Sequence, residues 1–389
     1  MLHLSKFRNI CIVAAVMMVG VFSSCKDDDK TADDNDELFV QILASYVDKT
    51  IVPTYKNLAE AALEMRAANI ALKTNPTDAN MQAASAAWMK ARIWWEKNEA
   101  FLFGPVGEDA LDIDGHIDSW PLELNDITNI IVEKNGNITG AEAWNLDSEV
   151  IGFHVTEYLL YRNGQTRPVA DLSTAELNYL TAATDALVWD CVLAYVAWVG
   201  ENNVSAEMKA VFNENPDVVK HLNNNPNFKN FAGQMKMEAG TKYISASAAI
   251  MEISTGASDI ANEVGETKIA SPYNTHKVEE VESWYSWHSL DDYKNNIESI
   301  KNAYLGGLDN STRTSISLST FVAQKDAQLD KDIKAKIDDA IAKINAIGTG
   351  GKSFYEVVRD RINADQVDDA TDACTDLAKL FDYLTDIVD

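Results

Sequence analysis

Cysteine and basic residues are scarce in this 389-residue sequence, which has four cysteines and 33 lysines and arginines against 60 acidic residues. The formal net charge is -27, and an acidic surface of that size argues against nucleic acid and anionic lipid as partners. Cys191 and Cys374 lie in helical-looking segments, where lone cysteines usually act as small buried apolar residues. The sequence leaves open whether these two form a disulfide.

Alternation of polar and apolar residues, the pattern of a half-buried strand, is absent over any useful length, and no solenoid-length repeat is visible. Apolar residues recur at helical spacing, and 46% hydrophobic residues are ample for a core. The sequence therefore predicts an all-α protein of two helical, four-helix-bundle-like domains packed side by side. We place the N-terminal bundle at 37–204 and the C-terminal bundle at 205–389.

Several catalytic motifs are also missing. The zinc-hydrolase patterns HExxH and HxxEH do not occur, nor does the Gly-x-Ser-x-Gly nucleophile elbow. No cysteine downstream of the N-terminal apolar segment lies beside a histidine. The sequence therefore offers no complete motif for these hydrolase classes.

The first 24 residues predict a signal peptide. Lys6 and Arg8 precede an apolar segment at 10–22, and two serines then lead into Cys25. This order resembles a bacterial lipoprotein signal, cleaved before Cys25 with lipid on its sulfur; an ordinary signal peptide with an incidental cysteine is the alternative. We therefore expect an exported lipoprotein, bound to the outer membrane through Cys25.

An acidic tract at 25–36 follows and would act as a solvated tether. The tract also resembles the surface-export signal of Bacteroidota lipoproteins, which would expose the protein at the cell surface. Beyond it, helices are expected at 38–72 (broken near Ile51 by Pro53), 78–103, 141–162, 173–200, 228–255, 290–305, 319–347, 354–362 and 366–388, with loops at 106–125 and 265–278.

The rest of the chain is organised around residues 151–161, a helical segment that is apolar on nearly every side and is therefore expected to be buried. It contains His154 and Glu157, which are three residues apart and so project from one face. Burying either group alone is costly, so each needs a partner: the other, a third group or a metal.

Four stretches resemble the imelysin family. Its hallmark GxHxxE stands at 152–157 as Gly-Phe-His-Val-Thr-Glu, followed by Tyr-Leu-Leu-Tyr, and Pro-Thr-Tyr at 53–55 matches the family's usual Pro and Tyr. Residues 94–105 resemble its Trp…Glu-Ala…Phe-Gly-Pro segment. Residues 282–293 resemble its Ser-Phe-Ser…Asp segment, although Trp and His stand where small polar residues are expected. The ordered match spans about residues 40–305.

The resemblance implies two helical-bundle domains with the motif near their interface. The family carries a peptidase name, and its relatives include periplasmic iron-uptake components with the same HxxE. We therefore expect binding of a divalent metal, with iron, zinc and manganese as candidates and iron first, or of a small ligand. The expected role is uptake, with an outer-membrane uptake partner.

For a metal, the predicted ligands are His154, Glu157 and Glu99, since one imidazole with carboxylates suits iron, manganese or zinc. Glu99 follows Arg92 and Trp95 on one helical stripe, and Glu96 is its competitor. The other candidate contacts are Arg92, Glu96, Asp118, Ser286, His288 and Asp292.

Two alternatives stay open. A peptidase of the imelysin type would need a fuller ligand set, which His116 or His288 would supply. In a site without metal, His154 and Glu157 would bind each other and Arg92 or Ser286, and would only fix the packing of the two domains.

Overall fold

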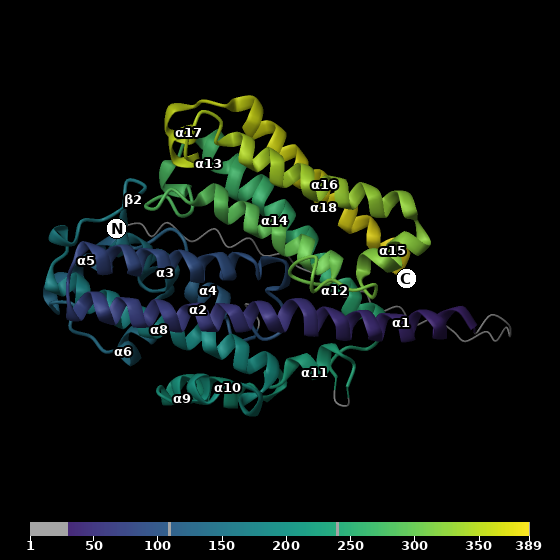
Figure 1. Cartoon of the computed structure of the whole chain (residues 1–389), viewed down its shortest axis with the longest axis horizontal. Coiled ribbons are helices and arrows are strands. Elements are labelled where there is room, and N and C mark those ends of the chain that lie inside the picture. The colour runs from purple at the N-terminus through teal and green to yellow at the C-terminus, as the bar shows by residue number, and fades with distance from the viewer. Residues whose placement is uncertain (1–29, 108–109, 239–240, 389) are drawn as a thin grey trace, which may run out of the picture.

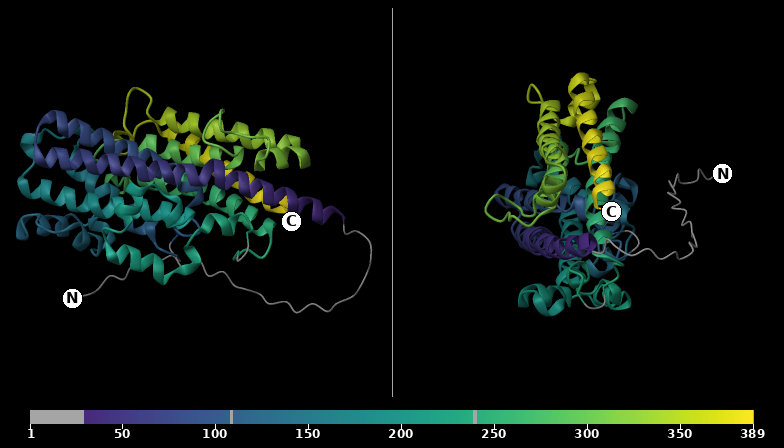
Figure 2. Two further views of the ribbon diagram at one scale, coloured as in Figure 1. Left: turned by 60° about the horizontal axis from the view of Figure 1, so that its bottom comes forward. Right: turned by 90° about the vertical axis from the view of Figure 1, so that its right-hand side faces the viewer.

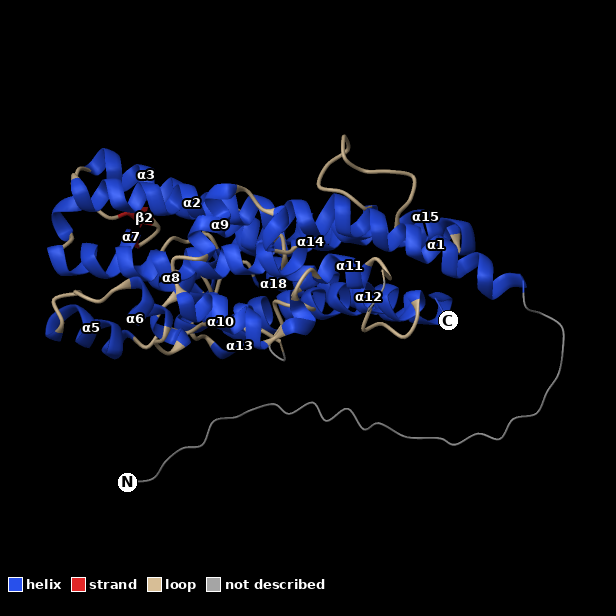
Figure 3. Cartoon of the chain, turned by 90° about the horizontal axis from the view of Figure 1, so that it is seen from below, coloured by secondary structure: helices blue, strands red, loops and turns tan. Residues whose placement is uncertain are grey.

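The computed structural model describes residues 30–107, 110–238 and 241–388. Within these ranges the regular secondary structure is nearly all helical, and the only strands are the two-residue antiparallel pair β1 (Tyr161–Arg162) and β2 (Gln165–Thr166) (Figure 3). The all-α prediction is therefore confirmed. The predicted signal peptide (1–24) and the lipidation site Cys25 lie outside the described residues.

The first bundle is a ring of four helices in which α2 lies between α3 and α8 (Figure 1). The short α7 contacts both α3 and α8 and so closes the ring. Their bounds are α2 (Val52–Thr74), α3 (Asp78–Glu96), α7 (Gly152–Leu160) and α8 (Thr174–Val199). Local chemistry sets their starts: Pro53 occupies the first turn of α2, the Thr77 side chain caps α3, and Ser173 and Glu176 form a capping box on α8.

The second bundle is a similar ring in which α18 lies between α12 and α16, and α14 packs on both α12 and α16. Figure 2 shows this bundle stacked on the first along their shared length. Its helices are α12 (Ala246–Asn262), α14 (Ser289–Leu305), α16 (Ala327–Ile347) and α18 (Ala364–Val388). The N-terminal helix α1 (Lys30–Tyr46) extends beyond its own bundle to pack on α12.

The remaining elements connect or cover these helices. They are η1 (Val47–Ile51), η2 (Glu99–Phe101), α4 (Ile113–Ile117), α5 (Leu124–Glu133), α6 (Gly140–Trp144), η3 (Ser148–Val150), η4 (Val169–Asp171), η5 (Glu201–Asn203), α9 (Ala206–Phe212), α10 (Pro216–Asn224), η6 (Pro226–Phe228), α11 (Phe231–Met235), η7 (Glu263–Ala270), α13 (Ser271–Thr275), η8 (Val278–Glu280), α15 (Leu318–Lys325) and α17 (Phe354–Asp360). Of these, η1 and η7 are π-helical and the other η elements are 3-10 turns.

Helix α8 is long and apolar enough to cross a membrane by length and composition. However, 89% of its most apolar window is buried among the other helices, which identifies it as the central core helix of the first bundle. Cys191 on α8 and Cys374 on α18 are both buried and free, so they do not form a disulfide in this structure.

Several expected segments differ from the structure: the helix predicted at 319–347 is divided at Asp326 into α15 and α16, and the loop predicted at 106–125 contains α4. The helix predicted at 141–162 is interrupted, because Gly152 has φ +83° and its neighbour Ile151 is extended. The helix predicted at 228–255 is also wrong, since Asn230 and Met237 adopt left-handed conformations and α12 begins only after its Ser245 cap. The loop predicted at 265–278 is largely helical, as η7 and α13.

The domain limits remain a prediction, but three helices pack differently from what these limits imply. α9 and α10 follow the predicted boundary at 204/205, yet they pack on α8 and so accompany the first bundle. At the other end, α1 begins at Lys30, inside the predicted tether, and packs on the second bundle. The two bundles meet where α3 and η2 lie against α12 and α14.

Candidate functional site

A buried cluster of charged side chains lies where the two bundles meet. It draws on α3, η2, the segment after α4, and α7 from the N-terminal half, and on η7, the segment before α14 and the first turn of α14 from the C-terminal half. The members with little or no exposed side-chain area are Arg92, Glu96, Glu99, Asp118, His154, Glu157, Lys268, Glu282 and Asp292. Acidic groups outnumber cationic groups in this cluster, which favours an additional cation.

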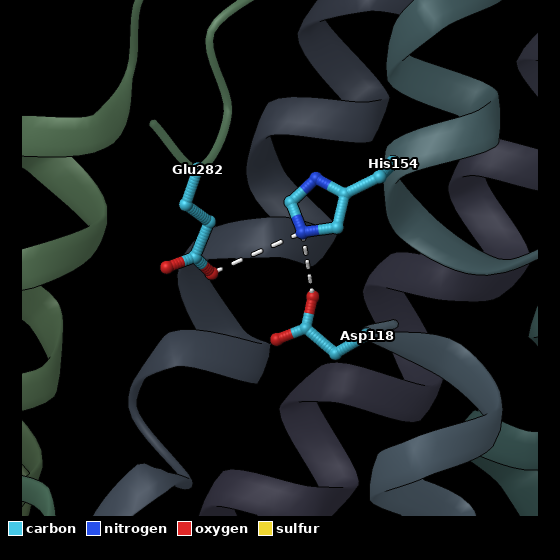
Figure 4. Close-up of side chains that lie close together, drawn as sticks. All are labelled: Asp118, His154 and Glu282. Carbon is cyan, nitrogen blue, oxygen red and sulfur yellow. Dashed lines mark ion pairs between the residues drawn. The ribbon is translucent and has the colours of Figure 1, made fainter. Parts of the chain in front are cut away.

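His154 is fully buried on α7 and is held between acids on both sides of its ring. Its Nδ1 lies 3.2 Å from Oε2 of Glu157. On the other side, Nε2 lies 3.2 Å from Oδ1 of Asp118 and 3.9 Å from Oε1 of Glu282 (Figure 4). Nε2 makes no hydrogen bond of acceptable geometry, so this buried nitrogen is held only by the ion pair with Asp118 and faces the Glu282 carboxylate.

Glu157 orients this histidine. Its Oε1 accepts hydrogen bonds from the backbone N–H of Ser286 at 2.8 Å and from the Ser286 hydroxyl at 2.7 Å. Its other oxygen faces His154. Both oxygens of Glu157 are therefore engaged, and the carboxylate fixes the ring from the side opposite Asp118 and Glu282.

Arg92 is the principal counter-charge of the cluster. Its guanidinium, buried on α3, pairs with Asp118, with Glu96 at 2.5 Å and with Glu282 at 2.5 Å, while Nε lies 3.5 Å from Asp292. Since Glu282 and Asp292 come from the C-terminal half, Arg92 joins the two bundles electrostatically. Such a planar group with five donors suits several carboxylates at once.

A pocket of about 270 Å³ opens onto this cluster. It is lined by Glu99, Leu102, Asp114, Asp118, Trp120, Glu263, Thr267, Lys268, Glu280 and Glu282. A second pocket, of about 340 Å³, shares Glu99, Leu102, Asp114 and Glu263 with it and continues along α12. The buried cluster is therefore reached through an acidic passage, which would attract cations.

Among the described residues, two groups of side chains each bring three potential ligand atoms within 4.8 Å of one another. The first is Asp118, His154 and Glu282, and the second is Glu96, Glu99 and Asp118. The two groups share Asp118. Its Oδ2 also accepts a hydrogen bond of 2.7 Å from the indole of Trp95, which fixes the carboxylate.

Burial and ion pairing shift the pKa values of the acids in this cluster in opposite directions. Burial raises the pKa values of Glu96 and Glu99 well above their usual range, and burial together with Asp118 raises the pKa of Asp114 to about 7. Asp118 is also buried, but Arg92 and His154 outweigh this and hold its pKa below the usual range. Glu282 has a lowered pKa because Lys268 and Arg92 overcome the effect of burial.

His154 itself responds to opposing influences. Burial and the neighbouring Arg92 lower its pKa, but the contacts with Asp118 and Glu157 are stronger and raise the pKa to about 9. Without a metal, the imidazole is therefore protonated on both nitrogens and positively charged at neutral pH. A metal ion at Nε2 would have to displace that proton.

The glycine of GxHxxE allows the motif helix to approach α4. Gly152 has φ +83°, and a Cβ there would lie 2.4 Å from the carbonyl oxygen of Ile117. Asp118 is the next residue along the chain. The glycine therefore brings the N-terminus of α7 against the segment that supplies the carboxylate facing His154.

The structure gathers most of the predicted site residues. Arg92, Glu96, Glu99, Asp118, His154, Glu157, Ser286 and Asp292 all lie in or beside the cluster, and Asp292 also accepts a hydrogen bond from Ser283. His288 does not: its ring contacts Tyr161, and its Nδ1 pairs with the exposed Asp291. His288 therefore lies apart from the ligand groups around His154, and its contact with the site stays a prediction.

Sequence reasoning assigned no role to two central residues, Glu282 and Lys268. Glu282 lies in the segment that resembles the imelysin pattern, but its position against His154 depends on how the bundles pack. Lys268 was expected in a loop. Trp120, whose ring lies 4.8 Å from that of His154, falls in the predicted loop at 106–125.

Known proteins resemble this chain over most of its length. Iron-regulated protein A of Synechococcus elongatus is 27% identical over 266 residues, covering 68% of this chain and 64% of that protein. The chain thus spans a little under two thirds of that relative. A crystal structure of an iron-regulated protein A precursor from Parabacteroides distasonis is 28% identical, with a TM-score of 0.75, covering 90% of this chain and 95% of the other.

An imelysin-like protein from Psychrobacter arcticum shares the fold, with a TM-score of 0.62 at 12% identity over 89% of this chain and 93% of that one. The family model described as imelysin matches residues 51–384, which include both bundles and every residue of the cluster. This protein therefore belongs to the imelysin family.

Proposed function

We propose that this protein is an exported outer-membrane lipoprotein that binds a divalent metal ion between its two bundles and takes part in iron uptake. In this proposal His154 binds the ion through Nε2, and Asp118 and Glu282 supply carboxylate oxygens. Glu99 and Glu96 lie in the adjoining carboxylate group, and Glu157 orients the imidazole.

The observation that carries the proposal is the nitrogen Nε2 of His154. It is buried, is ion-paired with Asp118 at 3.2 Å and lies 3.9 Å from Glu282, yet it makes no hydrogen bond of acceptable geometry. A buried nitrogen whose only partner is a poorly aligned ion pair is incompletely satisfied. A metal ion would satisfy Nε2 and both carboxylates at once, and the Glu157 contact on Nδ1 matches the arrangement that usually orients a metal-binding histidine.

The donor set favours particular ions. One imidazole with carboxylates suits Fe²⁺, Mn²⁺ or Zn²⁺ rather than a thiolate-bound metal. The name of the relatives, iron-regulated protein A, supports iron among these. Hydrolysis by zinc usually relies on more than one histidine ligand, whereas the described part of the chain brings His154 alone to this cluster.

Metal titration tests this function. The purified protein would be stripped with chelator and titrated by calorimetry with Fe²⁺ under anaerobic conditions, and with Mn²⁺ and Zn²⁺. We expect one site of micromolar or better affinity that is lost in His154→Ala. The matched control is His288→Ala, which removes a histidine outside the cluster. Equal, negligible heats for wild type and His154→Ala would refute metal binding and leave His154 as a packing residue.

The membrane attachment is tested separately. Cells grown with a labelled fatty acid should incorporate the label into the wild-type protein but not into Cys25→Ser. Protease added to intact cells would then distinguish surface exposure from attachment to the inner leaflet. A Cys25→Ser protein that stays labelled and membrane-bound would overturn the lipoprotein assignment.

A further inference from the structure

A lysine ammonium lies among the same carboxylates as the proposed metal ligands. Lys268 belongs to η7, and its side chain is only 10% exposed. Its Nζ lies 3.1 Å from Oε2 of Glu282, whose Oε1 lies 3.9 Å from Nε2 of His154. The carboxylate of Glu282 therefore faces the ammonium through Oε2, while Oε1 faces His154 and is paired with Arg92 at 2.5 Å. π-helical segments such as η7 occur often at functional sites.

The other partners of Lys268 are more distant. Its Nζ lies 3.7 Å from Oε1 of Glu263 and 4.0 Å from Oε1 of Glu99. Glu99 is buried, whereas 49% of the Glu263 side chain is exposed. A lysine side chain has a flexible four-carbon stem with three rotatable donors. Rotation of this stem would move the ammonium from Glu282 toward Glu263 without any shift of the backbone.

We propose that Lys268 is an internal competitor for the metal ion and sets the affinity of the site. This inference rests on the proposed function. In the metal-free protein the ammonium and the Arg92 guanidinium together neutralise Glu282, at 3.1 and 2.5 Å. When a divalent cation binds Glu282, the ammonium is repelled and pairs with Glu263 at the edge of the pocket.

Competition from Lys268 should weaken metal binding. Two cations a few ångströms apart repel strongly where solvent is largely excluded, so the metal must displace the ammonium in order to bind. The same repulsion favours release of the metal. The protein would thereby hold its cation less tightly than the bare carboxylates would, which suits a carrier that passes its metal to a partner.

The test is Mn²⁺ binding to the full-length protein, purified in detergent and stripped with chelator, with free Mn²⁺ followed by electron paramagnetic resonance. Lys268→Met removes the charge but keeps the length of the side chain, and we expect it to bind Mn²⁺ about tenfold more tightly or better. Lys268→Arg keeps the charge and should stay within about threefold of wild type.

A matched control removes the same charge from the rim of the pocket. Lys277 is 51% exposed, and its Nζ lies 2.5 Å from Oε1 of Glu280, which lines the pocket. Lys277→Met should therefore change the affinity by less than about twofold, because exposed charges are screened by solvent.

A double-mutant cycle tests the movement toward Glu263. Glu263→Gln removes the position to which the ammonium withdraws, so it should weaken Mn²⁺ binding in the wild-type background. In the Lys268→Met background the same substitution should have a clearly smaller effect, because Glu263 acts through the lysine. Equal effects in the two backgrounds would overturn the movement of the ammonium.

The remaining outcomes separate the inference from the function on which it rests. If wild type binds Mn²⁺ in a manner that depends on His154, and Lys268→Met binds it equally or more weakly, Lys268 is not a competitor. If wild type shows no such binding, the proposed function fails and this inference fails with it. Should Lys268→Met not fold, Lys268→Gln, which keeps a hydrogen-bond donor for Glu282, takes its place with the same expected tightening.

Discussion

At the scale of single residues, the two nitrogens of His154 have different surroundings. Nδ1 faces Glu157, which Ser286 holds with two hydrogen bonds, while Nε2 points at Asp118 and Glu282 without a hydrogen bond of its own. This asymmetry gives Glu157 and Asp118 separate tasks, although both are acids beside one ring. The first orients the imidazole, and the second shares the proposed metal with it.

Glu157→Gln should therefore weaken metal binding without removing a ligand. The amide keeps the size of the carboxylate but loses its charge. We expect metal affinity to fall about 10- to 100-fold, the usual effect of losing a residue that orients a metal ligand without binding the metal itself. Calorimetry with Mn²⁺ measures it. Asp291→Asn is the matched control, since Asp291 pairs with His288 at the same three-residue spacing on the surface. Equal affinities for Glu157→Gln and wild type would contradict the orienting role.

The protonation of His154 predicts how stability depends on pH in the metal-free protein. Its pKa of about 9 in the fold lies above the ordinary value of 6.5. A group with a raised pKa stabilises the fold fully below its unfolded pKa and loses that contribution as pH rises through the folded pKa. We therefore expect stability to fall between pH 6.5 and 9, by up to about 3 kcal/mol from this residue.

Urea unfolding at several pH values across that window measures the effect. His154→Gln should show a much flatter profile than wild type, and His288→Gln should follow wild type. If wild type and His154→Gln lose stability in parallel, the ion pairs of His154 with Asp118 and Glu157 do not stabilise the fold as inferred.

At the scale of elements, the approach of α7 to α4 depends on Gly152. Gly152→Ala would add a Cβ 2.4 Å from the carbonyl oxygen of Ile117 and would force a side chain into φ +83°. We expect a loss of about 2–4 kcal/mol in unfolding free energy. Because Asp118 follows Ile117, metal affinity should also fall by about tenfold, since one of three ligands is displaced.

Gly350→Ala is the control for this substitution. Gly350 has φ +81°, nearly the same strain, but nothing lies within 4 Å of its added Cβ. Gly350→Ala should lower the unfolding free energy by only about 1 kcal/mol, because it adds backbone strain at positive φ but no steric clash. It should leave metal affinity unchanged. Similar losses for Gly152→Ala and Gly350→Ala in denaturant unfolding would show that the contact with Ile117 is unimportant.

The helices that the sequence predicted correctly are those with local signals. Pro53 marks the start of α2, Thr77 caps α3, and Ser173 with Glu176 begins α8. Errors arose where a residue takes a left-handed conformation that tertiary contact imposes. Gly152, Asn230 and Met237 are such cases, and apolar periodicity carries no information about them. The break before α7 was missed for this reason, although the motif glycine itself was the signal.

At the scale of the whole molecule, the site exists only when the two bundles are packed. His154 and Asp118 come from the N-terminal half, and Glu282, Ser286 and Lys268 from the C-terminal half. The sequence predicted His154 and Glu157 because both stand in one motif on one helix face. It could not assign Glu282, because no local pattern states which acid of the second half will face the ring once α14 packs on α3.

Arg92 is the residue that most directly joins the two halves, so its loss should affect the molecule as a unit. Arg92→Met would leave Asp118, Glu96, Glu282 and Asp292 buried without their common counter-charge. Removing one partner of a buried ionic cluster typically costs about 3–5 kcal/mol. We expect a loss of that size in urea unfolding, with the two bundles separating into two transitions.

Arg66→Met is the matched control. Arg66 pairs with Asp185 at 2.7 Å and with Glu214 at 2.8 Å, and its side chain is 20% exposed. Both acids lie on α8 or on the segment between α9 and α10, which pack on α8, so these ion pairs do not join the two bundles. Its loss should cost about 1 kcal/mol or less and keep a single transition. Saturating Mn²⁺ should restore part of the stability of Arg92→Met, because a bound cation replaces the missing charge. A single, unshifted transition for Arg92→Met would mean that apolar contacts alone hold the bundles together.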